Sequence, residues 1–109
     1  MELERYDEAN AYIEKYLSVR SDDAEAYLLL GDLTRAQGEN DFKTLNLALS
    51  SYQKALNLNS ECSECYREIG LAFKYLGDFE KANEYLTKYL KFNPKVPDAG
   101  IIRSYIQTK

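Results

Sequence analysis

The chain repeats itself at fixed distances, and this regularity limits its possible folds more than any other feature. The segment Tyr27–Gly31 matches Tyr66–Gly70, and farther along the two copies Ala48 matches Ala82. The first spacing exceeds the second by five residues. A unit of about 34 residues, with five extra residues between Gly38 and Ala48, explains both spacings. Units of this length are typical of proteins in which small structural repeats stack on one another.

Each half of the unit has the apolar spacing of an amphipathic helix. Tyr66, Ile69 and Phe73 fall on one helical face, as do Ala82 and Leu86. The chain has only five glycines and two prolines, which argues against a turn-rich β protein. The sequence therefore predicts no strand and six helices, at about residues 3–18, 23–37, 42–58, 63–76, 79–91 and 97–107.

Glycine and aspartate mark the expected helix ends. We expect Gly38 and Gly77 to end their helices in the left-handed conformation that glycine adopts easily. Asp78 is expected to cap the helix after Gly77, and either Asn40 or Asp41 the helix after Gly38. The five extra residues should lengthen that loop or the start of the next helix by up to about a turn and a half.

Composition excludes several classes of function. The 109 residues suit one domain, and a net charge of −4 argues against a general nucleic-acid binder. Residues 1–23 carry −4 and residues 63–109 carry +2, an asymmetry able to steer a partner but also common on solvated helix faces. The absence of histidine removes Ser-His-Asp and Cys-His mechanisms and any His-ligated metal site, so no enzyme is expected.

The chain shows no targeting or membrane segment. No apolar run approaches the length of a membrane span, and the N-terminus lacks the basic start and apolar stretch of a signal peptide. We therefore expect a cytoplasmic protein.

Two cysteines, Cys62 and Cys65, stand where the two copies meet. A helix N-terminus lowers a thiol pKa, but Glu61 and Glu64 disfavour a thiolate there. A single CxxC supplies only two of the four usual zinc ligands, and a thioredoxin-like site needs neighbouring strands. The favoured interpretation is two small residues at a helix junction, with no metal and no cofactor. A redox pair and an intermolecular zinc site stay open.

The two copies share a longer motif. The second copy carries it at Tyr66, Ile69, Gly70, Phe73, Ala82, Leu86 and Pro94, and the first at Tyr27, Leu30, Gly31, Thr34, Ala48, Tyr52 and Ser60. In this order the residues resemble the signature of the tetratricopeptide repeat. The small residues of this signature should sit where helices approach closely, whereas Tyr16 and Tyr89 stand where the family prefers a small residue.

The resemblance implies an all-α fold: a right-handed superhelical solenoid of helix-turn-helix repeats with a C-terminal capping helix. The chain is then one domain over 1–109. Residues 1–23 form a half repeat that supplies only a second helix, and residues 24–62 form a repeat with the insertion. Residues 63–96 form the next repeat. Residues 97–109 keep an apolar stripe and suit a cap that closes the open end of the stack.

The resemblance also implies a function. Proteins of this family hold a peptide segment or a partner's helix in a concave groove, and so act as adaptors or scaffolds. Carried onto this chain, the groove residues are Glu25, Leu28, Asp32, Arg35, Ala36, Glu64, Arg67, Leu71, Lys74 and Tyr75. The plain alternative is that these residues form solvated helix faces.

Two further expectations concern the partner. The Lys and Asn clamp of chaperone-docking members is absent, because Leu28, Asp32, Arg67 and Leu71 occupy its positions. One hypothesis is that Arg67 and Lys74 hold an acidic side chain, with an apolar one against Leu71. The partner should be a protein or peptide, with no nucleic acid and no membrane span. The alternative function is self-assembly into a homo-oligomer through the uncapped face of the N-terminal helix.

Overall fold

The computed structural model describes residues 3–38 and 41–106. Within these ranges the chain forms helices and no strand. The helices are α1 (Leu3–Val19), α2 (Ala24–Gly38), α3 (Phe42–Leu58), α4 (Ser63–Leu76), α5 (Phe79–Phe92) and α6 (Ala99–Tyr105). The six predicted helices are confirmed, with bounds that agree to within two residues. None of the helices in the described ranges is long and apolar enough to cross a membrane.

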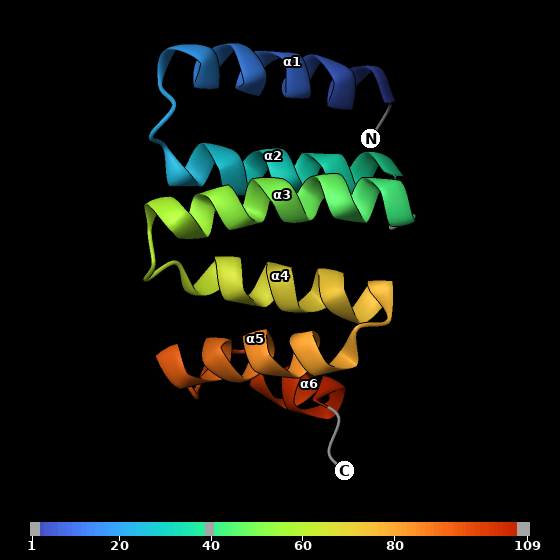
Figure 1. Ribbon diagram of the computed structural model, residues 1–109, viewed down its shortest axis with the longest axis vertical. Helices are drawn as coiled ribbons and strands as arrows, with labels where there is room; N and C mark the ends of the chain where they lie inside the picture. The colour runs from blue at the N-terminus through green and yellow to red at the C-terminus, as the bar shows by residue number, and fades with distance from the viewer. Residues whose placement is uncertain (1–2, 39–40, 107–109) are drawn as a thin grey trace.

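The helices stack in chain order along the long axis of the molecule (Figure 1). The most extensive contacts join α2 to α3 and α4 to α5, so these helices form two pairs. α3 then packs on α4, α1 on α2 and α6 on α5. The stack measures 43 × 27 × 22 Å. The predicted all-α solenoid of helix pairs is confirmed.

The helix ends follow the predicted signals with one exception. Asp41 caps α3 by accepting the backbone N–H of Thr44 at 2.8 Å, and Asp78 caps α5. Gly77 ends α4 with φ 87°, as expected. The prediction for Gly38 is wrong, because this residue lies in the last turn of α2 and has no positive φ. Asn40, the alternative cap, lies outside the described residues.

Gly38 is needed for close packing instead. A Cβ atom built on Gly38 would collide with the side chain of Thr44 on α3, so only glycine fits at this crossing. Three of the five extra residues lengthen the next helix. α3 begins six residues before Ala48, whereas α5 begins three residues before the equivalent Ala82. The predicted lengthening of this helix is confirmed, by nearly one turn.

The core runs through the middle of the stack. Its main cluster of buried side chains comprises Leu45, Ala48, Leu49, Tyr52, Ile69 and Ala72. A second cluster comprises Leu86, Tyr89 and Ile102, and so joins α6 to α5. α1 contributes much less: Tyr12 and Val19 are 72% and 80% exposed. The first helix therefore lies at the edge of the packed structure.

Gly31 and Gly70 are buried where the paired helices touch, as the motif predicts. A Cβ on Gly70 would lie 2.7 Å from Cδ2 of Leu86, and one on Gly31 would collide with the ring of Tyr52. Real side chains do not approach so closely, so each pair depends on a glycine at its crossing point.

The tyrosines that depart from the family pattern connect one repeat to the next. Tyr16 donates a hydrogen bond from its hydroxyl to Oδ2 of Asp23 at 2.6 Å, just before α2 begins. Tyr89 does the same to Oδ1 of Asp98 at 2.7 Å, just before α6 begins. The larger residue is accommodated because its hydroxyl reaches the start of the following helix.

Candidate functional site

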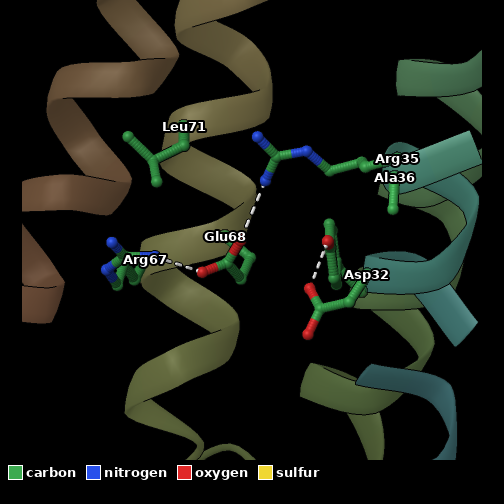
Figure 2. Close-up of a pocket in the computed structure, with 7 residues that line it drawn as sticks. Asp32, Arg35, Ala36, Arg67, Glu68 and Leu71 are labelled. Carbon is green, nitrogen blue, oxygen red and sulfur yellow. Dashed lines mark hydrogen bonds and ion pairs between the residues drawn. The ribbon is translucent and has the colours of Figure 1, made fainter. Parts of the chain in front are cut away.

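A pocket of about 520 Å³ lies between α2 and α4 (Figure 2). Its lining residues come from α2, α3 and α4: Asp32, Arg35, Ala36, Tyr52, Arg67, Glu68 and Leu71. The structure thus brings together five of the groove residues proposed from the sequence, namely Asp32, Arg35, Ala36, Arg67 and Leu71. Two lining residues, Tyr52 and Glu68, escaped the sequence reasoning.

The other proposed groove residues lie elsewhere. Glu25 lines a separate depression between α1 and α2, and Leu28 packs against the main core cluster. Glu64 is exposed in the first turn of α4. Lys74 is placed over the aromatic ring of Tyr105, with Nζ 4.6 Å from the ring centroid, and also 5.1 Å from that of Tyr75. Tyr75 itself is half exposed. None of these residues lines the pocket between α2 and α4.

Ion pairs run across the pocket in a continuous chain. Oε1 of Glu68 accepts a hydrogen bond from Nη1 of Arg35 at 2.8 Å, and Oε2 pairs with Nη1 of Arg67. Nε of Arg67 in turn donates to Oδ2 of Asp98 at 2.6 Å. We call Arg35–Glu68–Arg67–Asp98 the ion-pair chain; it joins α2 to α4 and α4 to the start of α6.

The ion-pair chain argues against the hypothesis that Arg67 holds an acidic side chain of a partner. Two carboxylates, from Glu68 and Asp98, already bind its guanidinium group. Lys74, the second cation of that hypothesis, lies over Tyr105 outside the pocket. An acidic ligand at Arg67 would lie beside two carboxylates that belong to the protein, and they would repel it.

Burial and ion pairing shift the pKa values of the residues in the ion-pair chain in different directions. Burial raises the pKa of Glu68 and outweighs the effect of the two arginines. Burial also acts to raise the pKa of Asp98, but hydrogen bonds from Arg67 and Tyr89 hold it below its usual value. Burial acts to lower the pKa of Arg67, but the bonds to Asp98 and Glu68 raise it. Arg67 and Asp98 are therefore both charged at neutral pH.

Tyr52 and Asp32 form the other polar part of the pocket. The ring of Tyr52 is fully buried, and its hydroxyl donates to Oδ1 of Asp32 at 2.6 Å. Burial, followed by this bond to Asp32, raises the pKa of Tyr52, so the hydroxyl keeps its proton. No lysine or arginine among the described residues forms an ion pair with Asp32.

The sequence contains signals that could have placed Tyr52 and Glu68 in the pocket. Tyr52 belongs to the repeat motif and its ring packs in the core, but a tyrosine also brings a hydroxyl that needs a polar partner. Glu68 falls on the helical stripe formed by Glu64, Leu71 and Tyr75, with i, i+4, i+7 spacing from Glu64. Tracing that stripe would have included Glu68.

The cysteines are joined. Cys62 and Cys65 lie at a helix junction as predicted, but they form a disulfide, so the interpretation that they are simply two small residues is wrong. The physical reason is local: residues three apart in the first turn of a helix lie on one face, and their Cα atoms are 5.2 Å apart. Cys62 also caps α4, since its Sγ accepts the N–H of Cys65 at 3.0 Å. The described residues contain no cluster of three or more potential metal ligands.

Among curated proteins, the chain is similar to two much longer relatives. It is 28% identical over 92 residues to the BBSome complex member BBS4 of Bos taurus, a match that covers 84% of this chain and 17% of that protein. It is 39% identical over 44 residues to the Sol locus transcriptional repressor of Clostridium acetobutylicum, covering 40% of this chain and 14% of the repressor. The chain thus spans less than a fifth of either relative.

Two crystal structures of MamA share the fold. Their TM-scores are 0.75 and 0.74, at 22% and 23% sequence identity. The superpositions cover 92% and 91% of this chain, and 54% and 57% of the respective MamA chains. One tetratricopeptide-repeat profile matches the sequence over residues 1–41, and a second profile of the same name matches it over residues 63–96. These two matches take in most of the chain, and the helix pairs have the stacking that the profile implies. The chain belongs to the tetratricopeptide-repeat family.

Proposed function

We propose that this protein is an interaction module that binds a peptide segment or a helix of a partner protein between α2 and α4. The observation that carries the proposal is the pocket at this place, lined from two successive repeats. It presents charged groups together with the apolar side chains of Leu71 and Ala36. Such a mixture suits the recognition of a peptide, which offers both polar and apolar side chains.

The charged groups of the pocket are held in place before any partner arrives. The side chains of Arg35 and Glu68 are only 15% and 16% exposed, and each is fixed by an ion pair. A surface that is already ordered loses less conformational entropy when it binds. The same groups suit catalysis poorly, because the Tyr52 hydroxyl is protonated and Glu68 is held between two arginines. We therefore propose an adaptor or scaffold role and no enzymatic one.

Blocking the pocket tests this proposal. Random peptides displayed on phage would be selected on the immobilised protein, and the enriched peptides titrated by fluorescence polarisation. Ala36→Trp places an indole at the pocket from an exposed position, and should weaken binding by tenfold or more, about 1.4 kcal/mol. Ala11→Trp, the same change at an exposed position of α1, is the matched control and should have no effect. Equal binding to both variants would refute a site between α2 and α4.

One observation favours self-assembly as a second candidate function. α1 exposes Tyr12 and Val19 beside a depression of about 420 Å³, which Lys15, Tyr16 and Arg20 also line. We infer that residues 1–23 are the second half of a repeat and that this face binds a second copy of the chain. Light scattering should then show an oligomer that dissociates on dilution and is lost in Tyr12→Glu/Val19→Glu. A monomer at every concentration would exclude this alternative.

A further inference from the structure

We propose that the pocket between α2 and α4 selects a partner segment that carries a lysine or arginine next to an apolar residue. The basic side chain binds Asp32, and the apolar side chain packs on Leu71 and Ala36. The inference rests on the proposed peptide-binding function and adds to it the chemical class of the ligand. It also reverses the sign of the charge that the sequence alone suggested for the partner.

The distribution of charge carries the first step. Three carboxylates, from Asp32, Glu68 and Asp98, accompany two guanidinium groups in the pocket and the ion-pair chain. Both guanidinium groups bind Glu68, and Arg67 binds Asp98 as well. Asp32 accepts its hydrogen bond from a neutral hydroxyl instead. The surplus charge of the described site is therefore negative, and it resides on Asp32.

The second argument compares how an acidic and a basic side chain of a partner would fit among the existing ion pairs. An acidic side chain would have to approach guanidinium groups that already bind Glu68 or Asp98, and it would be repelled by these carboxylates beside it. A basic side chain forms a new ion pair with Asp32 and breaks none. The pocket thus favours a cation by the contacts it already contains.

The position of Asp32 is also suitable. The hydroxyl of Tyr52 holds Oδ1, and the buried ring of Tyr52 lies against Gly31 and cannot swing away. The second oxygen of Asp32 points away from that bond (Figure 2). Asp32 is exposed, so a ligand can reach this oxygen from solvent. A carboxylate fixed in this way binds an ammonium or guanidinium group without first becoming ordered.

The apolar requirement comes from the facing wall. Leu71 reaches the pocket from α4, whereas Asp32 reaches it from α2 (Figure 2). Leu71 is partly buried against the second core cluster, and this leaves the rest of its surface available to a ligand. Because Asp32 on α2 and Leu71 on α4 line a single pocket, the ligand must present a basic and an apolar side chain within neighbouring residues.

The test compares which peptides the protein and its variants enrich from a random library displayed on phage. The wild type should enrich lysine or arginine beside leucine, isoleucine or phenylalanine. Asp32→Asn keeps an oxygen for Tyr52 but removes the charge, and should weaken the selected basic peptides about two- to fivefold. Asp32→Lys should shift enrichment to acidic residues. Glu25→Lys makes the same change of charge on α2 outside the pocket, and should leave the basic preference intact.

The outcomes separate this inference from the function on which it rests. Acidic peptides enriched by the wild type, or binding that Asp32→Asn leaves unchanged, would refute the inference while peptide binding stands. Failure to enrich any peptide would refute both. If Asp32→Lys does not fold, the affinity of Asp32→Asn for the selected basic peptides decides the test. Added salt should weaken the basic peptides on the wild type more than on Asp32→Asn, because an exposed ion pair is screened.

Discussion

The pairs α2–α3 and α4–α5 are built on one plan but differ where they face the pocket. In the first pair Gly31 packs against the ring of Tyr52, and the next residue in the sequence is Asp32. In the second pair Gly70 packs against the side chain of Leu86, and the next residue is Leu71. The tyrosine brings its hydroxyl to a carboxylate, whereas the leucine is matched by an apolar residue. The residue at the crossing and the residue in the pocket therefore change together. At this equivalent position the pocket receives a carboxylate from one repeat and an apolar side chain from the next.

The starts of α2 and α4 differ in the same manner. Asp23 and Cys62 occupy equivalent positions of the two copies, and each caps its helix. Oδ1 of Asp23 accepts the N–H of Ala26 at 3.2 Å, and Sγ of Cys62 accepts that of Cys65 at 3.0 Å. The first cap is supported by Tyr16 and the second by a disulfide. Two chemistries thus fulfil one structural role.

The largest expected effect comes from giving the second pair the tyrosine of the first. Leu86→Tyr crowds Gly70 and directs a hydroxyl towards Leu71, where no acceptor replaces Asp32. Overpacking and an unsatisfied buried hydroxyl together should lower the free energy of unfolding by about 3 kcal/mol in urea denaturation. Leu86→Tyr/Leu71→Asp restores the partner and should recover about 1 kcal/mol. If the double variant is no more stable than Leu86→Tyr alone, the aspartate does not serve as the partner of the tyrosine in the second pair.

The two crossing glycines should respond unequally to alanine. The ring of Tyr52 is buried and hydrogen-bonded, so it cannot yield to a Cβ on Gly31, whereas the side chain of Leu86 can change rotamer. After the gain of about 1 kcal/mol in helix propensity, Gly31→Ala should still destabilise by about 2 kcal/mol and Gly70→Ala by about 1 kcal/mol. Thermal unfolding measures the difference. Equal losses would show that both crossings have the same rigidity.

The two helix starts should be interchangeable. Cys62→Ala/Cys65→Ala removes the disulfide and the cap and should cost about 2 kcal/mol in urea denaturation. Cys62→Asp/Cys65→Ala copies the start of α2 and should recover about 1 kcal/mol of that loss. If a reducing agent leaves the unfolding midpoint of the wild type unchanged, the disulfide contributes nothing to stability.

The smallest expected effect concerns pH. The hydrogen bond from Tyr16, and then that from the backbone of Ala26, lowers the pKa of Asp23. A lowered pKa stabilises the fold above the unfolded value of about 3.9, and the contribution is lost as pH falls through the folded value. In an NMR titration, Tyr16→Phe should raise the pKa of Asp23 towards its ordinary value. The cap at Cys62 should show no such titration, because a disulfide sulfur carries no proton.

Much of the fold could be predicted from the sequence because the repeat spacing and the helical periodicity agree. They set the number of helices and the bounds of each. Gly38 shows where such reasoning ends: glycine has two uses, in left-handed turns and at close crossings. The choice between them depended on Thr44, a residue of the next helix. Only the tertiary structure reveals that contact.

The pocket was harder to predict than the fold. Spacing placed Asp32, Arg35 and Leu71 on the right faces, since equivalent helix positions point the same way in each repeat. It did not reveal that Arg67 is neutralised by Asp98, which lies far along the chain at the start of α6. Pairing between repeats decides which charge of the pocket is left for a partner. A single helix contains no information about such pairs.

The ion-pair chain has a mechanical consequence. It ties α2, α4 and the start of α6 together on the side of the stack that carries the pocket, whereas α3 and α4 meet through the apolar core. Dissolved ions screen contacts between exposed charges, but they screen partly buried ion pairs much less. Dissolved ions reach the ion-pair chain only weakly, because the side chains of Arg35 and Glu68 are 15% and 16% exposed. The distance between α2 and α4 is therefore held by a contact that changes in ionic strength do little to weaken.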